Sequence, residues 1–335
     1  MTTSNLRPLR ILATGVSTPA RWVDSRELDA RLGLAPGTVF ARTGVSRRGV
    51  EPERNAAEVS AQAAHAALAR AGLGLEAIDA VVCANASHDQ AMPCNAALLH
   101  RALGLRSVPA FDINASCIGF LMALDLVASL LASRRYRRVL VTSCDLASRA
   151  LDANDLDTFG LFGDGAAAAV LEAANENDTA GPALLGARFE TWSEAAHACE
   201  IPGGGSRLTP DRYPGDYREV CTFRMDGKRL YRAVADRFDP FVAALLADAG
   251  LSLDAIDRVI PHQASALGMA HVFRRLAVPR ERIEDIFAAH GNQVSASLPT
   301  ALHAALDSGR LRAGDTALLI GTAAGVTLGG AVLRL

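Results

Sequence analysis

The chain has 335 residues, of which 50% are hydrophobic and 21% charged, and its 34 basic and 36 acidic side chains leave a formal net charge of −2. This length allows about two domain-sized units with a sizeable core, and the composition excludes a disordered chain, which combines low hydrophobicity with high net charge. The balance of charges excludes a dedicated nucleic-acid-binding protein, because neutralising phosphates requires an excess or a stripe of basic residues.

The predicted elements alternate between helices with Ala/Leu periodicity and short strands that are apolar throughout. In chain order they are a helix over 56–71, a strand over 80–84, a helix over 118–132, strands over 138–142 and 166–171, a helix over 230–249, a strand over 258–261, a helix over 296–308 and strands over 317–321 and 329–333. Residues 175–220 are rich in Gly and Pro and weakly periodic, which indicates an excursion or flap. The alternation predicts an α/β fold whose sheets are covered on both faces.

The sequence carries no visible targeting or membrane signal. The N-terminus lacks the apolar stretch behind a basic start that marks a signal peptide. The longest apolar region, residues 118–132, is short for a membrane span and contains Asp125. The six cysteines lie far apart without a C-x-x-C pair, which is typical of reduced thiols, and no zinc-ligand spacing occurs. We therefore expect a soluble cytoplasmic protein without a metal site.

The sequence repeats itself at long range. AGLGLEAIDAVVCANAS, beginning at residue 71, matches AGLSLDAIDRVIPHQAS, beginning at residue 249, at ten of seventeen positions. The same offset of 178 residues takes Asn114 to Asn292 and Cys117 to Ser295. The period is far too long for a solenoid. We therefore predict a duplicated domain, with halves at residues 1–174 and 175–335.

Three residues are candidates for chemistry. Cys117 lies in FDINASCIGFLMAL, where a strand end, a turn and a helix start place the thiol near free N–H groups that stabilise a thiolate; a buried, inert cysteine is an equal alternative. His262 directly follows a predicted strand and Asn292 lies in a polar turn, and each alone is more typical of a structural residue. Because a duplication brings equivalent loops toward one pseudo-twofold axis, we hypothesise a single site containing all three.

Six motifs, spread over nearly the whole chain, resemble the β-ketoacyl-acyl carrier protein synthase III family of thiolase-like condensing enzymes. They are ARTGVSRR (41–48), FDINASCIGF (111–120), LFGDGAAAAVL (161–171), VIPHQAS (259–265), AHGNQVSAS (289–297) and GTAAGVTLGGAVL (321–333). The resemblance implies a thiolase-like five-layer α-β-α-β-α fold made from a duplicated βαβαβ-type unit, in agreement with the repeat. It also implies a homodimer, no cofactor, and acyl carrier protein and acyl thioesters as partners.

The resemblance further implies a catalytic triad of Cys117, His262 and Asn292. Cys117 takes an acyl group from a thioester. His262 and Asn292 then donate hydrogen bonds to the carbonyl oxygen of a malonyl thioester and stabilise the enolate that forms as CO₂ leaves. The backbone N–H groups of Cys117 and Ala324 make a second oxyanion hole. A neutral Asn at 292 favours decarboxylative condensation, because a carboxylate there would repel the developing oxyanion.

Five positions are expected to contact substrate. Phe159, Phe162 and Phe223 are candidates for an apolar lining, with ordinary core packing as the alternative for each. Met92 falls where the family limits primer length across a dimer interface, and a flexible Met favours a longer or less usual acyl group. Arg42 matches a basic position of the family and is expected to attract phosphates.

The remaining family positions concern the carrier and coenzyme A. Arg274 and Arg275 match basic positions expected to dock an acidic carrier protein. Three positions depart from the family: Thr38 replaces a Trp that stacks on the adenine of coenzyme A, Leu156 replaces the Arg that completes this clamp, and Leu267 replaces a basic docking residue. The departures favour specialised metabolite synthesis over the first step of fatty acid synthesis.

The expected function is a decarboxylative Claisen condensation. An acyl primer held on Cys117 would condense with a malonyl or related carrier-protein thioester to give a 3-ketoacyl product. Two alternatives stay open: an acyltransferase that passes the acyl group from Cys117 to an alcohol or amine, and a non-catalytic partner subunit that keeps the fold.

Overall fold

A computed structural model describes residues 6–175 and 177–335. Its main sheet has nine strands in the order β11-β12-β13-β8-β1-β7-β6-β4-β5. Their bounds, in chain order, are β1 (Arg7–Val16), β4 (Ala80–Cys83), β5 (Ala110–Asp112), β6 (Arg138–Asp145), β7 (Gly165–Ala173), β8 (Ala183–Thr191), β11 (Arg258–Pro261), β12 (Thr316–Ala323) and β13 (Thr327–Arg334). Among the residues that the structure describes, only two pairs, at Arg7 and Pro8, join β1 to β8, so the sheet consists of two larger sections with a narrow connection.

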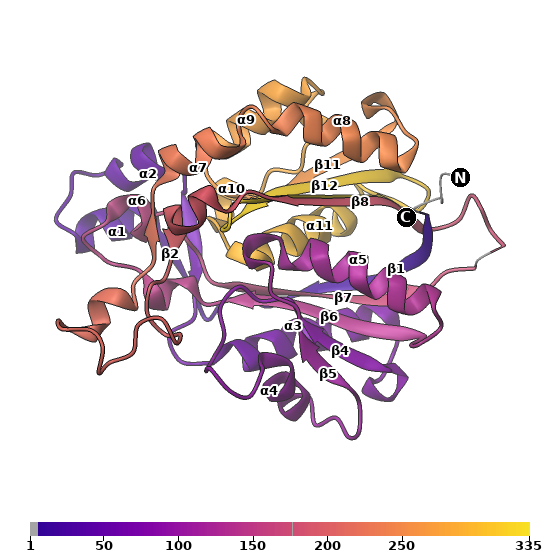
Figure 1. The fold of residues 1–335 in the computed structure, drawn as a ribbon, viewed down its shortest axis with the longest axis horizontal. Coiled ribbons are helices and arrows are strands. Elements are labelled where there is room, and N and C mark those ends of the chain that lie inside the picture. The colour runs from indigo at the N-terminus through magenta and orange to yellow at the C-terminus, as the bar shows by residue number, and fades with distance from the viewer. Residues whose placement is uncertain (1–5, 176) are drawn as a thin grey trace.

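The two sections and their helices form five layers (Figure 1). Helices α3 (Ala56–Ala71) and α4 (Asn95–Ala102) cover one outer face, while α8 (Phe238–Ala249) and α9 (Ala266–Leu276) cover the other. Helices α5 (Gly119–Ala132) and α11 (Ser297–Asp307) lie between the sections. The central helix α5 is almost entirely apolar, as expected of a helix buried on most sides. The predicted five-layer α-β-α-β-α architecture is confirmed.

The repeat seen in the sequence is also present in the structure. At the offset of 178 residues, β4 corresponds to β11, β6 to β12, and the C-terminal end of α3 to that of α8. The correspondence extends to backbone angles: Ser116 has a φ of 50° and its equivalent Val294 a φ of 52°. The predicted boundary at residues 174 and 175 falls in the connection between β7 and β8.

Two expectations need correction. Residues 183–191, predicted to belong to the flap, form β8, which pairs with β13 along its whole length. Only the chain after it leaves the sheet, with the short strands β9 (Cys199–Glu200) and β10 (Arg224–Met225). The single helix predicted over 230–249 is broken into α7 (Gly227–Val234) and α8, because Pro240 has no N–H for a continuing helix.

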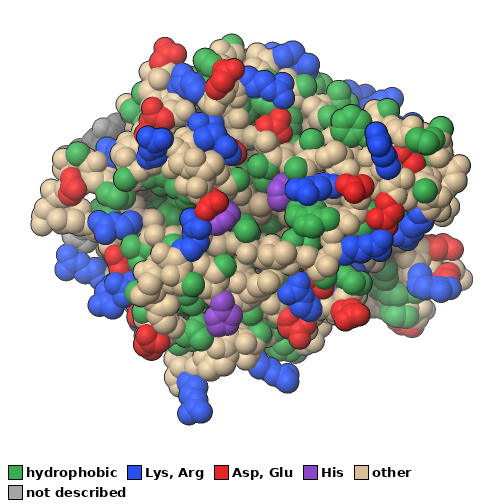
Figure 2. All heavy atoms as spheres, turned by 180° about the vertical axis from the view of Figure 1, so that it is seen from behind, with side chains coloured by type: hydrophobic (Ala, Val, Ile, Leu, Met, Phe, Trp, Pro, Cys, Tyr) green, Lys and Arg blue, Asp and Glu red, His purple; other side chains and the backbone are tan. Residues whose placement is uncertain are grey.

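The remaining helices and strands lie at one end of the five layers. They are β2 (Arg21–Asp24), α1 (Ser25–Arg31), α2 (Thr38–Thr43), β3 (Arg47–Val50), α6 (Leu156–Phe159) and α10 (Phe287–His290). Helix α3 begins where the sequence predicts, because Asn55 and Glu58 form a reciprocal capping box. On the face shown in Figure 2, basic and acidic side chains both occur across the surface. Over the described ranges, no helix is long and apolar enough to cross a membrane.

Candidate active site

A cavity of about 1480 Å³ lies between elements of the two halves. Its lining includes the turn at Cys117, the segment after β11 at His262, the turn at Asn292 and the strand end at Ala324. The structure therefore brings all four of these predicted residues to one cavity.

Cys117 lies in a single 3₁₀ turn, Ser116–Ile118, directly before α5. Ser116 is in the left-handed region, which is unfavourable for a residue with a side chain and is typical of functional turns. The turn packs closely on the end of β4, since a Cβ at Gly119 would lie 2.6 Å from the carbonyl oxygen of Ala84. A side chain at position 119 would therefore push the Cys117 turn away from the end of β4.

The environment of the Cys117 thiol favours its neutral form. Burial raises its pKa, and the nearby Cys199 and Asp145 raise it further. The backbone N–H groups of Ala324 and of Cys117 itself act in the opposite direction, because they donate hydrogen bonds toward the sulfur. These are the two N–H groups predicted to form an oxyanion hole.

His262 is held at the end of β11, where its backbone N–H donates to the carbonyl of Ile320 at 2.8 Å. A Cβ at Gly321 would lie 2.8 Å from the Cβ of His262 and 3.1 Å from Ile118, so this glycine allows the histidine to approach the Cys117 turn. Burial lowers the pKa of His262 to about 4. The imidazole is therefore neutral near pH 7 and has one N–H to donate.

The amide of Asn292 is fixed by its neighbours. Its Oδ1 accepts a hydrogen bond from the backbone N–H of Val294 at 2.8 Å, and its Nδ2 donates to the carbonyl of Ala264 at 3.1 Å. The backbone of Asn292 also bonds to Leu161 and Gly163. Because an amide nitrogen has two N–H groups, the second remains free to donate to a ligand.

Two residues bordering this cavity were not singled out from the sequence. Asp145 is buried and accepts hydrogen bonds from the backbone N–H and hydroxyl groups of both Ser87 and Ser295. It therefore links the first half to the turn that is equivalent to the Cys117 turn. A charged residue at the end of the apolar strand VLVTSCD was the available signal. Cys199, on β9, is the second thiol; burial raises its pKa to about 12.

The predicted aromatic residues divide between cavity and core. Phe162 and Phe223 border the cavity with their rings edge to face, their centroids 4.9 Å apart. Phe159 does not border it, and packs instead among Val23, Leu28 and Val39. Helix α6 ends at Phe159, and Phe162 lies three residues beyond this end. The side chains of Phe159 and Phe162 therefore lie in different environments.

The other residues predicted to contact substrate or carrier protein lie near the mouth of this cavity or outside it. Met92 is 83% exposed and is not part of the lining. Arg42 is exposed and ion-paired with Asp157, a residue that does border the cavity. Arg274 borders the mouth, whereas Arg275 points to an ion pair with Asp239 on α8.

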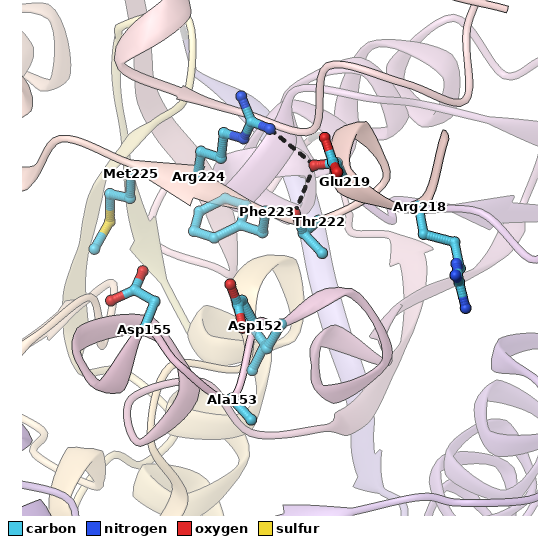
Figure 3. Close-up of a pocket in the computed structure, with 10 residues that line it drawn as sticks. Asp152, Ala153, Asp155, Arg218, Glu219, Thr222, Phe223, Arg224 and Met225 are labelled. Atoms are coloured by element: carbon cyan, nitrogen blue, oxygen red, sulfur yellow. Dashed lines mark hydrogen bonds between the residues drawn. The ribbon is translucent and has the colours of Figure 1, made fainter. Parts of the chain in front are cut away.

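A second cavity, of about 680 Å³, adjoins the first and shares Leu151, Phe223 and Met225 with it. Figure 3 shows Asp152 and Asp155 on the side facing Phe223 and Met225, with the Arg218 side chain directed away. Within the described ranges, no group of three or more His, Cys, Asp or Glu side chains has the arrangement of a metal site.

Known proteins resemble this chain over nearly its full length. The family described as "3-Oxoacyl-[acyl-carrier-protein (ACP)] synthase III" matches residues 111–190, and the corresponding C-terminal family matches residues 246–335. The beta-ketoacyl-[acyl-carrier-protein] synthase III of Syntrophomonas wolfei is 32% identical, with 97% of each chain aligned. That of Erythrobacter litoralis is 34% identical over 97% of this chain and 98% of the relative.

Solved structures agree with these sequence matches. The 3-oxoacyl-(acyl carrier protein) synthase III of Pseudomonas aeruginosa superposes with a TM-score of 0.87 at 32% identity, covering 98% of both chains. The priming beta-ketosynthase from the R1128 polyketide biosynthetic pathway superposes with a TM-score of 0.86 at 29% identity, covering 98% of this chain and 96% of the other.

Proposed function

Because the chain belongs to the β-ketoacyl-acyl carrier protein synthase III family, we propose that it condenses an acyl primer held on Cys117 with a malonyl or related carrier-protein thioester. The product is a 3-ketoacyl thioester. The observation that carries the proposal is the single cavity that Cys117, His262, Asn292 and Ala324 all border.

In the first half-reaction, the Cys117 sulfur attacks the carbonyl carbon of the acyl thioester. The oxyanion that forms accepts hydrogen bonds from the N–H groups of Cys117 and Ala324. The bond to the departing thiol then breaks, and the proton lost by Cys117 ends on that thiol. One thioester replaces another, so this step needs no external energy source.

In the second half-reaction, a malonyl thioester occupies the same cavity. The neutral imidazole of His262 and the free N–H of Asn292 donate hydrogen bonds to its thioester carbonyl oxygen, where negative charge develops as CO₂ leaves. The resulting carbanion attacks the acyl-Cys117 carbonyl and releases the thiolate of Cys117. Since decarboxylation supplies the carbanion, the proposed reaction uses no cofactor.

The two half-reactions provide the test. Purified protein is incubated with an acyl thioester and then with malonyl carrier protein, and acyl-Cys117, CO₂ and the product are measured by mass spectrometry and CO₂ release. Acylation of Cys117 followed by CO₂ release and a 3-ketoacyl product supports the proposal. Acylation followed by an ester or amide without CO₂ identifies an acyltransferase, and absence of any adduct identifies a non-catalytic subunit; either result overturns the proposal.

Three further properties belong to this proposal. The carrier protein is expected to approach over Arg274 and Arg275, which are both exposed. A homodimer would cover Met92, whose side chain is 83% exposed in the single chain, and this residue would then reach the primer site of the other protomer. We expect the protein to act in the cytoplasm.

A further inference from the structure

The mouth of the main cavity has a basic side formed by the second half of the chain. Lys228 and Arg232 on α7 and Arg274 on α9 border the cavity and are exposed. Lys228 is the only lysine in the sequence. Within the described part of the chain, Lys228 and Arg274 have no carboxylate partner within ion-pair distance, although Arg275 has one in Asp239. We call Lys228, Arg232 and Arg274 the basic rim.

A hydrogen-bonded pair holds the two helices of the basic rim together. The hydroxyl of Tyr231 on α7 lies 3.2 Å from Nδ1 of His271 on α9, and the rings meet edge to face with centroids 5.2 Å apart. Tyr231 is three residues after Lys228 and His271 three before Arg274, so both pairs share a helix face. Both Tyr231 and His271 border the cavity, and Nε2 of the buried His271 has no hydrogen-bond partner among the described residues.

The first half of the chain contributes acidic side chains to the linings of the two cavities. Asp152 and Asp155 border the adjoining cavity, and Asp157 borders the main one. Arg42 neutralises Asp157. In the described ranges, Asp152 and Asp155 accept hydrogen bonds only from their own loop and the start of α6, and no cation lies within ion-pair distance of either. Arg42 is near enough to Asp155 to interact with it electrostatically. Figure 3 shows neither Arg218 nor Arg224 directed at them; Arg218 is paired with Asp216. We call Asp152 and Asp155 the acidic rim.

We infer that this mouth selects acyl groups carried on a single-phosphate arm, as on a carrier protein, over acyl groups carried on coenzyme A. The inference rests on the proposed function. With the thioester at Cys117, the arm leads out through the mouth, where Lys228 and Arg274 meet one phosphate. Coenzyme A adds a nucleotide with further phosphates beyond that point. In the adjoining cavity those phosphates would meet the carboxylates of the exposed Asp152 and the half-buried Asp155, which repel them within the Debye length.

The experiment compares three small thioesters that carry the same acyl group: acyl-pantetheine, acyl-phosphopantetheine and acyl-coenzyme A. The rate of Cys117 acylation is measured by mass spectrometry of the whole protein at low salt. In the native protein, acyl-phosphopantetheine should react about tenfold faster than acyl-pantetheine, the value of a hydrogen bond to a charged group. It should also react faster than acyl-coenzyme A.

Two double variants measure the contribution of each rim to the selectivity separately. Lys228→Ala with Arg274→Ala should bring the phosphopantetheine-to-pantetheine rate ratio close to one. Asp152→Asn with Asp155→Asn keeps the oxygen acceptors of the loop and should raise the coenzyme A-to-phosphopantetheine ratio about threefold, as for exposed charges. Arg101→Ala removes an exposed cation of α4 that borders neither cavity and is the matched control.

The outcomes separate this inference from the proposed function. Acylation of Cys117 with acyl-coenzyme A as fast as with acyl-phosphopantetheine, or with ratios that the rim variants leave at native values, overturns the inference alone. Failure of every thioester to acylate Cys117 overturns the proposed function and the inference with it.

Discussion

Replacing Asn292 by Asp should separate the two half-reactions of the proposed cycle. In the native structure Nδ2 donates to the carbonyl of Ala264 at 3.1 Å, and its second N–H is free for the malonyl thioester. In Asn292→Asp an oxygen takes the place of this nitrogen, so the carbonyl of Ala264 faces a carboxylate and the enolate loses a donor. Loss of one oxyanion-hole donor reduces a rate by about 10²–10³-fold, and the like charge of the carboxylate reduces it further.

Acylation of Cys117 uses the N–H groups of Cys117 and Ala324 and should continue in this variant. The assay therefore measures two quantities on one sample: acyl-Cys117 by intact mass, and CO₂ from malonyl carrier protein. Asn292→Ala removes the donor without adding charge and should lose about 10²–10³-fold in CO₂ release. Release by Asn292→Asp within tenfold of the native rate, from a folded protein, would refute the assigned role of Asn292. Equal loss of acylation would refute the separation of the two oxyanion holes.

Three other predictions follow from the geometry around the site. Cys117→Ser should abolish the acyl adduct while leaving the melting temperature near the native value, as intact mass and thermal unfolding would show; an adduct that persists would place the nucleophile elsewhere. Gly321→Ala should slow CO₂ release by at least tenfold. The new Cβ would lie 2.8 Å from the Cβ of His262, and a small misplacement of a catalytic group has a large effect on rate. A native rate of CO₂ release would contradict this packing. Burial lowers the pKa values of His262 and His290 to about 4. Below pH 6.5 the unfolded chain therefore binds protons that the folded chain does not. The free energy of unfolding should fall by about 2 kcal/mol per histidine between pH 7 and pH 5. Denaturant unfolding of native protein and His290→Asn at both pH values checks this, since the variant should lose less stability on acidification.

The fold was predictable from the sequence because the duplication is still visible in it. The match between residues 71–87 and 249–265 aligns a helix end and a strand in each half, and both strands form. Strand β8 was missed since its sequence, ALLGARFET, lacks a clear apolar alternation and lies beside Gly and Pro residues. Its position depends on pairing with β13, whose partner residues are more than a hundred positions away, and local patterns do not report such pairing.

The site was predictable only in part, for a related reason. The turns and strand ends that carry Cys117, His262 and Asn292 could be read locally, but their joint catalytic role was implied by the family resemblance. At the mouth, Arg274 was expected from the family resemblance but Lys228 was not, because α7 reaches the same cavity through its contact with α9. The signal that was available and overlooked is Pro240, whose missing N–H ends any helix that would continue through it and so separates α7 from α8.

The duplication also explains how an asymmetric reaction can arise from two similar halves. Cys117 and Ser295 occupy equivalent positions, each after a residue with a positive φ. Ser295 uses its hydroxyl and N–H to bind the buried Asp145, whereas Cys117 borders the cavity. A nucleophile in the second turn would lie against a carboxylate, which disfavours a thiolate. The two copies of one turn therefore serve different ends: the first presents a reacting atom to the cavity, and the second ties the halves together so that His262 and Asn292 can reach the substrate held there.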